Sequence, residues 1–264
     1  MTPAPAVISF ENVSKRYGEA TAPVLDRVSL TVREREFLVV VGPSGSGKTT
    51  LLRLVNRLID PSEGAVRVEG EDVQAIDAVS LRRRIGYVFQ GIGLFPHMTI
   101  AENIAITPKL LGWDSARMAA RVDELIELVR LDRSKHRERY PSQLSGGEGQ
   151  RVGVARALAA KPRIVLMDEP FGALDPLTRE ALGEDYRRLH DELSLTTAMI
   201  THDMLEALLL ADRIAVIRDG RVIAEGTPQE LMNDPQDAYV SELMATPRRH
   251  AERLRALADR PRPN

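Results

Sequence analysis

The stretch Gly42-Pro-Ser-Gly-Ser-Gly-Lys-Thr49 decides the predicted fold, because it matches the spacing G-x-x-x-x-G-K-[ST] of a phosphate-binding loop. The apolar, β-branched run Phe37–Val41 precedes it and predicts a strand buried on both faces. Helical spacing over residues 49–58 follows it. Strand, glycine loop and helix in this order are the context in which such a loop presents its backbone N–H groups to phosphate.

Each residue of this loop is a candidate nucleotide contact. We expect Lys48 to reach the terminal phosphates and the Thr49 hydroxyl to ligate Mg²⁺. A dinucleotide-binding loop is excluded, because the G-x-G-x-x-G pattern that begins at Gly45 has Thr50 in place of its third glycine. The candidate nucleotide-binding residues of the loop are Gly42, Pro43, Ser44, Gly45, Ser46, Gly47, Lys48, Thr49 and Thr50.

Two adjacent acids, Asp168 and Glu169, end a second apolar run that covers residues 164–167. Next to a phosphate-binding loop, such a strand end offers one carboxylate to a metal ion and the other to a water molecule. We therefore predict that Asp168 belongs to the metal shell and that Glu169 orients or deprotonates a water.

The stretch Leu144-Ser-Gly-Gly-Glu148 predicts a helix start and a second anion site. Ser145 is a natural N-cap, and the two glycines that follow expose backbone donors. Glu148 occupies the N3 position of an S-x-x-E capping box. Two hypotheses compete: the carboxylate folds back onto the Ser145 backbone N–H, which we favour, or it faces the incoming phosphate and weakens the site.

The composition narrows the classes of function. The chain has 264 residues, a net charge of −2 and no cysteine. Disulfides, thiolate nucleophiles, zinc–thiolate sites and iron–sulfur clusters are therefore excluded, and no nucleic-acid partner is expected. No apolar stretch approaches the ~20 residues of a transmembrane helix, and no basic segment marks a secretory signal at the N-terminus.

The order of apolar segments predicts the organisation of the chain. Strand-like and helical segments alternate on both sides of a helical block at residues 99–159, which indicates a parallel α/β core with an inserted subdomain. Residues 246–264 carry six arginines against two acids. We expect a solvated, flexible basic tail there, with contact to lipid headgroups as the alternative.

With its motifs in this order, the sequence resembles the ATP-binding subunit of an ABC transporter over about residues 7–244. The glycine loop resembles Walker A, Asp168 and Glu169 resemble Walker B, and the stretch from Leu144 to Gln150 resembles the ABC signature. The resemblance extends to Tyr17 (the aromatic that stacks on adenine), Gln90 (the Q-loop glutamine), Asp175 (the D-loop aspartate) and His202 (the switch histidine).

The resemblance implies a fold and a set of cofactors. The fold is α/β, a P-loop NTPase core of the ABC ATPase type in residues 7–245, with an antiparallel β subdomain and a helical subdomain at about residues 91–160. ATP and Mg²⁺ are the implied cofactors. Glu169, His202 and Gln90 would serve hydrolysis, and Thr49, Gln90 and Asp168 would ligate the metal.

The resemblance also implies partners. Two copies would pair head to tail, so that Ser145, Gly146 and Gly147 of one copy close over the ATP held by Lys48 of the other. Integral membrane permease subunits would be moved by hydrolysis, and an extracytoplasmic solute-binding protein would act indirectly. The implied location is peripheral, at the cytoplasmic face of the inner membrane.

Several stretches, among them Ile92-Gly-Leu-Phe-Pro-His and Gln150-Arg-Val-Gly-Val-Ala-Arg156, resemble a narrower branch of importers, those for the osmoprotectants glycine betaine, choline, carnitine and proline. Glu148 and Gly149 depart from that branch, which usually has glutamines there. Three alternatives stay open: an importer ATPase for another small solute such as an amino acid, a non-transport ABC ATPase, and a module that holds ATP without hydrolysing it. The presence of Glu169 and His202 argues against the last.

Overall fold

The computed structural model describes residues 5–18 and 22–258. Its centre is a six-stranded sheet in the order β10-β9-β3-β8-β7-β6, in which β10 alone runs antiparallel to its neighbour. The bounds of these strands are β3 Phe37–Val41, β6 Ile85–Val88, β7 Ile164–Asp168, β8 Thr196–Thr201, β9 Arg213–Arg218 and β10 Arg221–Gly226. The parallel α/β core that the sequence predicts is confirmed.

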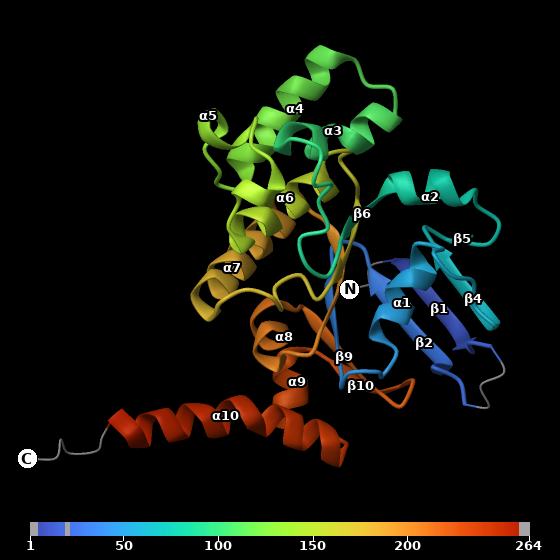
Figure 1. Cartoon of the computed structure of the whole chain (residues 1–264). Helices are drawn as coiled ribbons and strands as arrows, with labels where there is room; N and C mark the ends of the chain where they lie inside the picture. The colour runs from blue at the N-terminus through green and yellow to red at the C-terminus, as the bar shows by residue number, and fades with distance from the viewer. Residues whose placement is uncertain (1–4, 19–21, 259–264) are drawn as a thin grey trace, which may run out of the picture.

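A second, antiparallel sheet of four strands lies beside this core in the order β2-β1-β4-β5 (Figure 1). Its strands are β1 Ala6–Lys15, β2 Leu25–Arg33, β4 Glu63–Val68 and β5 Glu71–Asp72. Helix α1 (Lys48–Val55) lies between the two sheets, and α2 (Ala78–Arg84) leads from β5 to β6. This is the antiparallel β subdomain that the resemblance implies.

The apolar run of β3 is explained by two cores, one on each face of the central sheet. Phe37, Val39 and Val41 belong to the core beneath the helices, whereas Leu38 and Val40 belong to the core shared with α1 and the antiparallel sheet. Successive side chains of a strand point to opposite faces, so a strand between two cores is apolar at every position.

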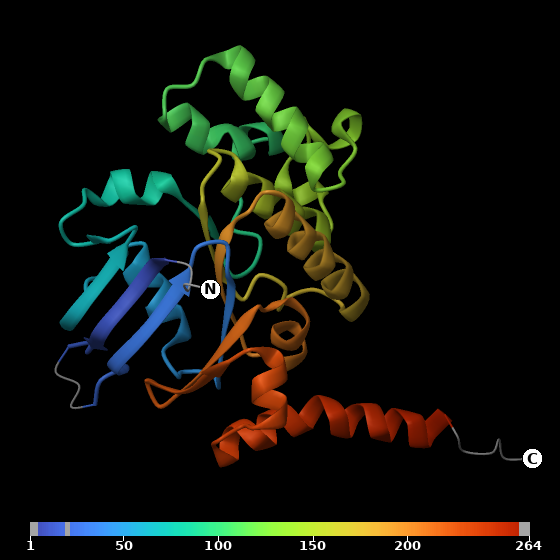
Figure 2. The same cartoon turned by 180° about the vertical axis from the view of Figure 1, so that it is seen from behind.

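The middle of the chain forms the inserted helical subdomain, which both views draw at the far end of the molecule from β10 (Figures 1 and 2). Each of its two longer N-terminal helices begins at an acid or hydroxyl cap, Thr99 for α3 and Asp114 for α4. Its elements are α3 Ile100–Leu110, α4 Ser115–Leu128, α5 Arg133–His136, the 3₁₀ turn η1 Pro141–Gln143 and α6 Gly146–Leu158.

The C-terminal part of the chain differs from the sequence prediction. Helices α7 (Pro176–Glu192) and α8 (Met204–Leu210) cover the core, and α9 (Pro228–Asn233) leads into α10 (Ala238–Ala258), which extends away from the body (Figure 2). Residues 246–258, predicted as the first part of a flexible tail, are therefore helical. Alanine, leucine, arginine and glutamate, which dominate this segment, are strong helix formers. Residues 259–264 of the predicted tail lie outside the described residues.

Across residues 5–18 and 22–258, no helix is both long enough and apolar enough to span a membrane.

Candidate nucleotide-binding site

The glycine loop joins the end of β3 to the start of α1 and lies tightly against neighbouring strands. A Cβ atom at Gly42 would stand 2.1 Å from the carbonyl oxygen of Ile217 on β9. Gly47 has a φ of +100°, and a Cβ atom there would stand 2.5 Å from Leu25 Cδ2 on β2. A side chain at either position would clash with these neighbours and displace the loop, so both positions require glycine for steric reasons.

Lys48 lies inside this loop rather than in solvent, with 5% of its surface exposed. Its Nζ donates to the carbonyl oxygens of Gly42, at 2.8 Å, and Pro43, at 3.0 Å. Burial lowers the pKa of Lys48, while the nearby carboxylates of Glu169 and Asp168 oppose that shift. The ammonium group is therefore held by the loop backbone and lies close enough to Glu169 and Asp168 to interact with their carboxylates.

The loop has the features of an anion site. Gly47 is the N-cap of α1 and offers no side-chain acceptor to the first helical N–H groups. The Ser46 hydroxyl is buried, and its oxygen has no hydrogen-bond partner. Free backbone donors, an unpaired hydroxyl and a buried ammonium group together fit a bound phosphate chain.

Asp168 and Thr49 meet as the sequence predicts. The Thr49 hydroxyl donates to Asp168 Oδ1 at 3.1 Å, and Asp168 is 6% exposed at the end of β7. Burial raises the pKa of Asp168, an effect that the hydrogen bonds from Thr49 and Tyr87 counteract. A carboxylate and a hydroxyl are hard oxygen donors, so this pair fits Mg²⁺.

Glu169, Gln90 and His202 also come together, from the ends of three neighbouring strands of the central sheet. Glu169 Oε2 lies 3.2 Å from His202 Nδ1 and 3.5 Å from Gln90 Nε2. The backbone of Glu169 has a φ of +44°, and its N–H donates to the Ile200 carbonyl oxygen at 3.0 Å. The carboxylate is thus held between two polar side chains, next to the metal-type pair of Thr49 and Asp168.

Tyr17 lies at the edge of this site, just beyond the end of β1. The residue is 42% exposed, and Lys15 Nζ lies 5.3 Å from the ring centroid. The Lys15 carbonyl oxygen accepts from the backbone N–H of Val24, whose own carbonyl is among the atoms closest to Gly47. Tyr17 therefore follows the strand that is tied to the segment bordering the loop, and it is accessible from solvent.

Ser145, Gly146 and Gly147 form the N-terminal turn of α6, in the helical subdomain. The capping interpretation of Glu148 is confirmed: Glu148 Oε2 accepts from the Ser145 backbone N–H at 2.8 Å. A Cβ atom at Gly147 would stand 2.6 Å from Thr178 Cγ2 on α7. The turn thus packs on the start of α7, where the N-cap Asp175 accepts from the Thr178 N–H.

The predicted residues therefore fall into two groups within one chain. The first surrounds the glycine loop and contains Asp168, Glu169, Gln90 and His202. The second consists of the α6 turn and Asp175.

Sequence reasoning missed two residues that contact these groups. The Tyr87 hydroxyl on β6 donates to Asp168 Oδ2 at 3.4 Å. The sequence does carry a signal for Tyr87. Side chains alternate along the short strand at residues 85–88, and this strand pairs with β7, which ends at Asp168. His136 contacts Glu148 at 3.0 Å across 12 residues, and no local pattern in the sequence links the two.

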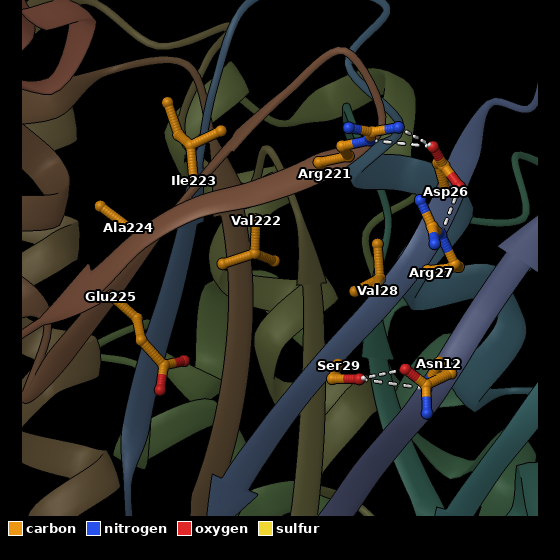
Figure 3. A pocket seen from close by; sticks show the side chains of 10 residues that line it. All are labelled: Asn12, Asp26, Arg27, Val28, Ser29, Arg221, Val222, Ile223, Ala224 and Glu225. Atoms are coloured by element: carbon orange, nitrogen blue, oxygen red, sulfur yellow. Dashed lines mark hydrogen bonds and ion pairs between the residues drawn. The ribbon is translucent and has the colours of Figure 1, made fainter. Parts of the chain in front are cut away.

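A shallow cleft elsewhere, between β2 and β10, carries none of the predicted residues (Figure 3). Asp26 and Arg221 face each other across it, and Arg221 Nε donates to Asp26 Oδ2 at 2.8 Å. The hydrogen bond from Arg221 lowers the pKa of Asp26. Asp26 also lies 3.4 Å from Arg27, and Glu225, at the other end of the cleft, pairs with Arg213 at 3.2 Å. The pairing of Asp26 with Arg221 suits a structural link between the two sheets.

Comparison with known proteins agrees with this geometry. Residues 25–172 match the family model described as ABC transporter. The choline transport ATP-binding protein OpuBA of Bacillus subtilis is 47% identical over 92% of this chain. The osmoprotectant import ATP-binding protein OsmV of Salmonella typhimurium is also 47% identical over 92%. The chain spans 63% and 64% of the length of these two relatives.

Solved structures give the same result. A dimeric, post-hydrolysis state of the ATP-binding cassette MJ0796 bound to ADP and Pi is 34% identical, with a TM-score of 0.76 over 84% of this chain and 98% of that one. CbiO1 from Clostridium perfringens, at 24% identity and a TM-score of 0.80 over 88% of this chain and 92% of that one, shares the fold. With a family model over residues 25–172 and a glycine loop built as that family requires, the chain belongs to the ABC transporter family.

Proposed function

We propose that this chain is the ATP-hydrolysing subunit of an ABC importer. The observation that carries the proposal is the convergence on the glycine loop of a buried Lys48, the Thr49–Asp168 pair and the Glu169 carboxylate. A cation, two hard oxygen ligands and a general base in one place are the parts that phosphoryl transfer to water needs.

Each group has a separate task in this proposal. The loop N–H groups and Lys48 neutralise the phosphates. Held by Thr49, Asp168 and Gln90, Mg²⁺ would add positive charge against the phosphate oxygens. Glu169 accepts the proton of the attacking water, and His202, which lies 3.2 Å from that carboxylate, keeps it in place. Tyr17 offers its open ring face to adenine.

The second group of residues supports a site shared between two copies. Ser145, Gly146 and Gly147 lie on the helical subdomain and pack on the start of α7, where Asp175 is the N-cap. The backbone donors at such a helix start can bind an anion. We infer that they close over the nucleotide of a second copy. The solved relative MJ0796 is described as dimeric and bound to ADP and Pi, which supports this arrangement.

We further propose that the transported solute is a quaternary-amine osmoprotectant such as glycine betaine or choline. The support is the printed function of the relatives, one named for choline transport and one for osmoprotectant import. The partners would be integral permease subunits and, through them, an extracytoplasmic binding protein. The chain would act from the cytoplasmic face of the membrane.

Transport assays test both parts of this proposal. The chain is reconstituted with its permease in vesicles, and uptake of labelled betaine, choline and an unrelated amino acid is measured with wild-type and Lys48→Ala chains. We expect ATP-dependent uptake of the quaternary amines by the wild type and none by the variant. Uptake of the amino acid alone would refute the proposal that the solute is a quaternary amine. Equal uptake by the wild-type and Lys48→Ala chains would refute the proposal that this chain is the ATPase subunit.

A further inference from the structure

His136, at the end of α5, is a buried histidine that no motif predicts. It is 8% exposed, and it joins α5 to the N-terminal turn of α6 through Glu148. Its position matters because that turn carries Ser145, Gly146 and Gly147, the donors that the proposed function assigns to phosphate.

Both ring nitrogens of His136 face oxygen atoms. Nδ1 lies 2.8 Å from the carbonyl oxygen of Asp132, and Nε2 lies 3.0 Å from Glu148 Oε1. The ring is thus held between the backbone of α5 and the Glu148 carboxylate on α6.

Glu148 is held in its ionised form by other donors. Its Oε2 accepts from the Ser145 backbone N–H at 2.8 Å and from the Ser145 hydroxyl at 2.9 Å. The Ser145 backbone bond first, then His136 and the Ser145 hydroxyl, lower the pKa of Glu148 to about 2. Glu148 Oε1 is therefore an acceptor, and His136 Nε2 is the donor in this contact.

The other charged groups around α5 have partners of their own. On α4, Asp123 pairs with Arg133 and Arg137, at 3.4 and 2.9 Å, and Glu127 lies 4.0 Å from Arg133. Within the α5 turn, the Asp132 carboxylate accepts from Ser134 and lies 3.4 Å from Lys135. Beyond α5, Glu138 pairs with Arg137 at 2.8 Å. From α6, Glu148 is the group whose carboxylate contacts the ring.

We propose that His136 is a positioning residue of the nucleotide site: its Nε2 holds the Glu148 carboxylate back against Ser145 and away from the phosphate side of the α6 turn. This rests on the proposed function, since only an incoming phosphate makes the position of that carboxylate matter. A freed carboxylate would remain attracted to the helix N-terminus and would compete with phosphate for the N–H groups of Gly146 and Gly147.

Loss of this contact has a consequence whose sign is fixed. Without the His136 donor, the capping box of α6 loses one of its hydrogen bonds, and ATP-driven closure becomes weaker. Hydrolysis should therefore fall when the ring is removed, and more steeply at low salt, where the freed carboxylate repels phosphate most strongly.

A set of matched variants tests this by measuring ATP hydrolysis at low and at high salt. His136→Gln keeps an amide donor toward Glu148, so its rate should stay within ~twofold of the wild type. His136→Ala should hydrolyse ATP ~tenfold more slowly than wild type, and adding Glu148→Gln should restore it to within ~twofold of Glu148→Gln alone. A role of His136 in packing alone would give no rescue, and that result would overturn the proposal.

A second measurement does not depend on hydrolysis. The imidazole ¹⁵N resonances of His136, assigned by their loss in His136→Gln, should show Nε2 as a hydrogen-bond donor in the wild type, and the Nε2 resonance should shift in Glu148→Gln. An Nε2 that carries no proton in the wild type would overturn the proposal even if the variants lost activity. Absence of any hydrolysis that Lys48→Ala abolishes would instead reject the proposed function, and the ¹⁵N result would still decide whether the His136–Glu148 link exists.

Discussion

Asp168 and Glu169 are neighbours in sequence, yet their carboxylates meet different surroundings. Asp168 ends β7 with its side chain buried against Thr49 and Tyr87, whereas Glu169 turns at a φ of +44° and meets His202 and Gln90. The left-handed backbone at Glu169 ends the regular strand geometry of β7, so the Glu169 side chain takes a direction different from that of Asp168. The two carboxylates therefore have different partners, as the separate roles that we propose for them require.

This separation makes Glu169→Gln an informative variant. We expect hydrolysis to fall by at least about a hundredfold, because an amide cannot accept a proton from water, while ATP affinity stays close to wild type. A stable dimer should appear by size-exclusion chromatography with Mg-ATP and be absent with ADP. A variant that turns over ATP at the wild-type rate would remove Glu169 from the role of general base.

Lys48 offers a second test at the scale of a residue. Its Nζ donates hydrogen bonds to the carbonyl oxygens of Gly42 and Pro43, so Lys48→Ala removes both the positive charge and these two bonds within the loop. We expect hydrolysis to be abolished and most ATP binding to be lost, measured by phosphate release and by calorimetric titration. Lys48→Arg keeps the charge and serves as the matched control, with a thermal unfolding scan to show that each variant is folded.

At the scale of the element, the capping box of α6 gives a stability prediction with a fixed sign. The pKa of Glu148 lies at about 2 instead of its ordinary 4.5, chiefly because of the Ser145 backbone N–H. A lowered carboxyl pKa stabilises the fold above the ordinary value, and that stabilisation is lost as the pH falls through the folded-state value. The difference in the free energy of unfolding between wild type and Glu148→Gln should therefore be largest above about pH 4.5 and shrink toward about pH 2.

Denaturant unfolding at a series of acidic pH values measures that difference. Glu230→Gln in the capping box of α9, where the Thr227 N–H likewise lowers the carboxyl pKa, is the matched control for a cap outside the site. A constant difference across the whole acidic range would mean that the Glu148 carboxylate contributes through packing rather than through its charge.

The same helix revises an expectation from sequence. In the first turn, alanine is favoured over glycine by ~1 kcal/mol, so Gly149→Ala would stabilise α6. In the structure, however, a Cβ atom at Gly149 would stand 3.0 Å from Ile92 Cδ1, and Ile92 belongs to the segment that follows Gln90. We therefore expect Gly149→Ala alone to leave the melting temperature nearly unchanged.

The gain should reappear once Ile92 is shortened. Gly149→Ala made in an Ile92→Ala background should raise stability by ~1 kcal/mol over Ile92→Ala alone. Equal gains in stability in both backgrounds would show that the Ile92 side chain moves aside at no cost in free energy. Helix propensity alone would then determine the effect of Gly149→Ala.

The elements show which parts of the fold were open to prediction. The buried strands β3 and β7 were predicted from their apolar runs, and Ser145 was predicted as the N-cap of a helix. Helix α5 was missed, because four residues are too short for a hydrophobic period. The helix at residues 246–258 was not predicted, because the positive charge of this segment was given more weight than its helix propensity.

At the scale of the whole molecule, the residues of the candidate site were predictable one at a time, but their division into two groups was not. Each motif has a local signature, whereas the separation of the α6 turn from the glycine loop follows from how the helical subdomain packs on α7. Tyr87 and His136 were missed for the same reason, since each meets its partner through tertiary packing.

That division leads to a test of the two-copy site by complementation. One variant is Lys48→Ala, which loses the loop. The other, Gly146→Asp, places a carboxylate on the phosphate side of the α6 turn. Gly146 suits this purpose better than Gly147, because a Cβ atom at Gly146 meets only Leu174 at 3.8 Å, whereas one at Gly147 would stand 2.6 Å from Thr178 Cγ2.

Each variant alone should be inactive, and an equimolar mixture should recover about a quarter of the wild-type rate, since half of the random dimers are mixed and each mixed dimer has one intact site of two. The control replaces Gly146→Asp with a chain carrying both substitutions, which offers neither an intact loop nor an intact turn to its partner. Recovery in that control, or none in the mixture when both variants still bind one another, would mean that the loop and the α6 turn do not form one site across two copies.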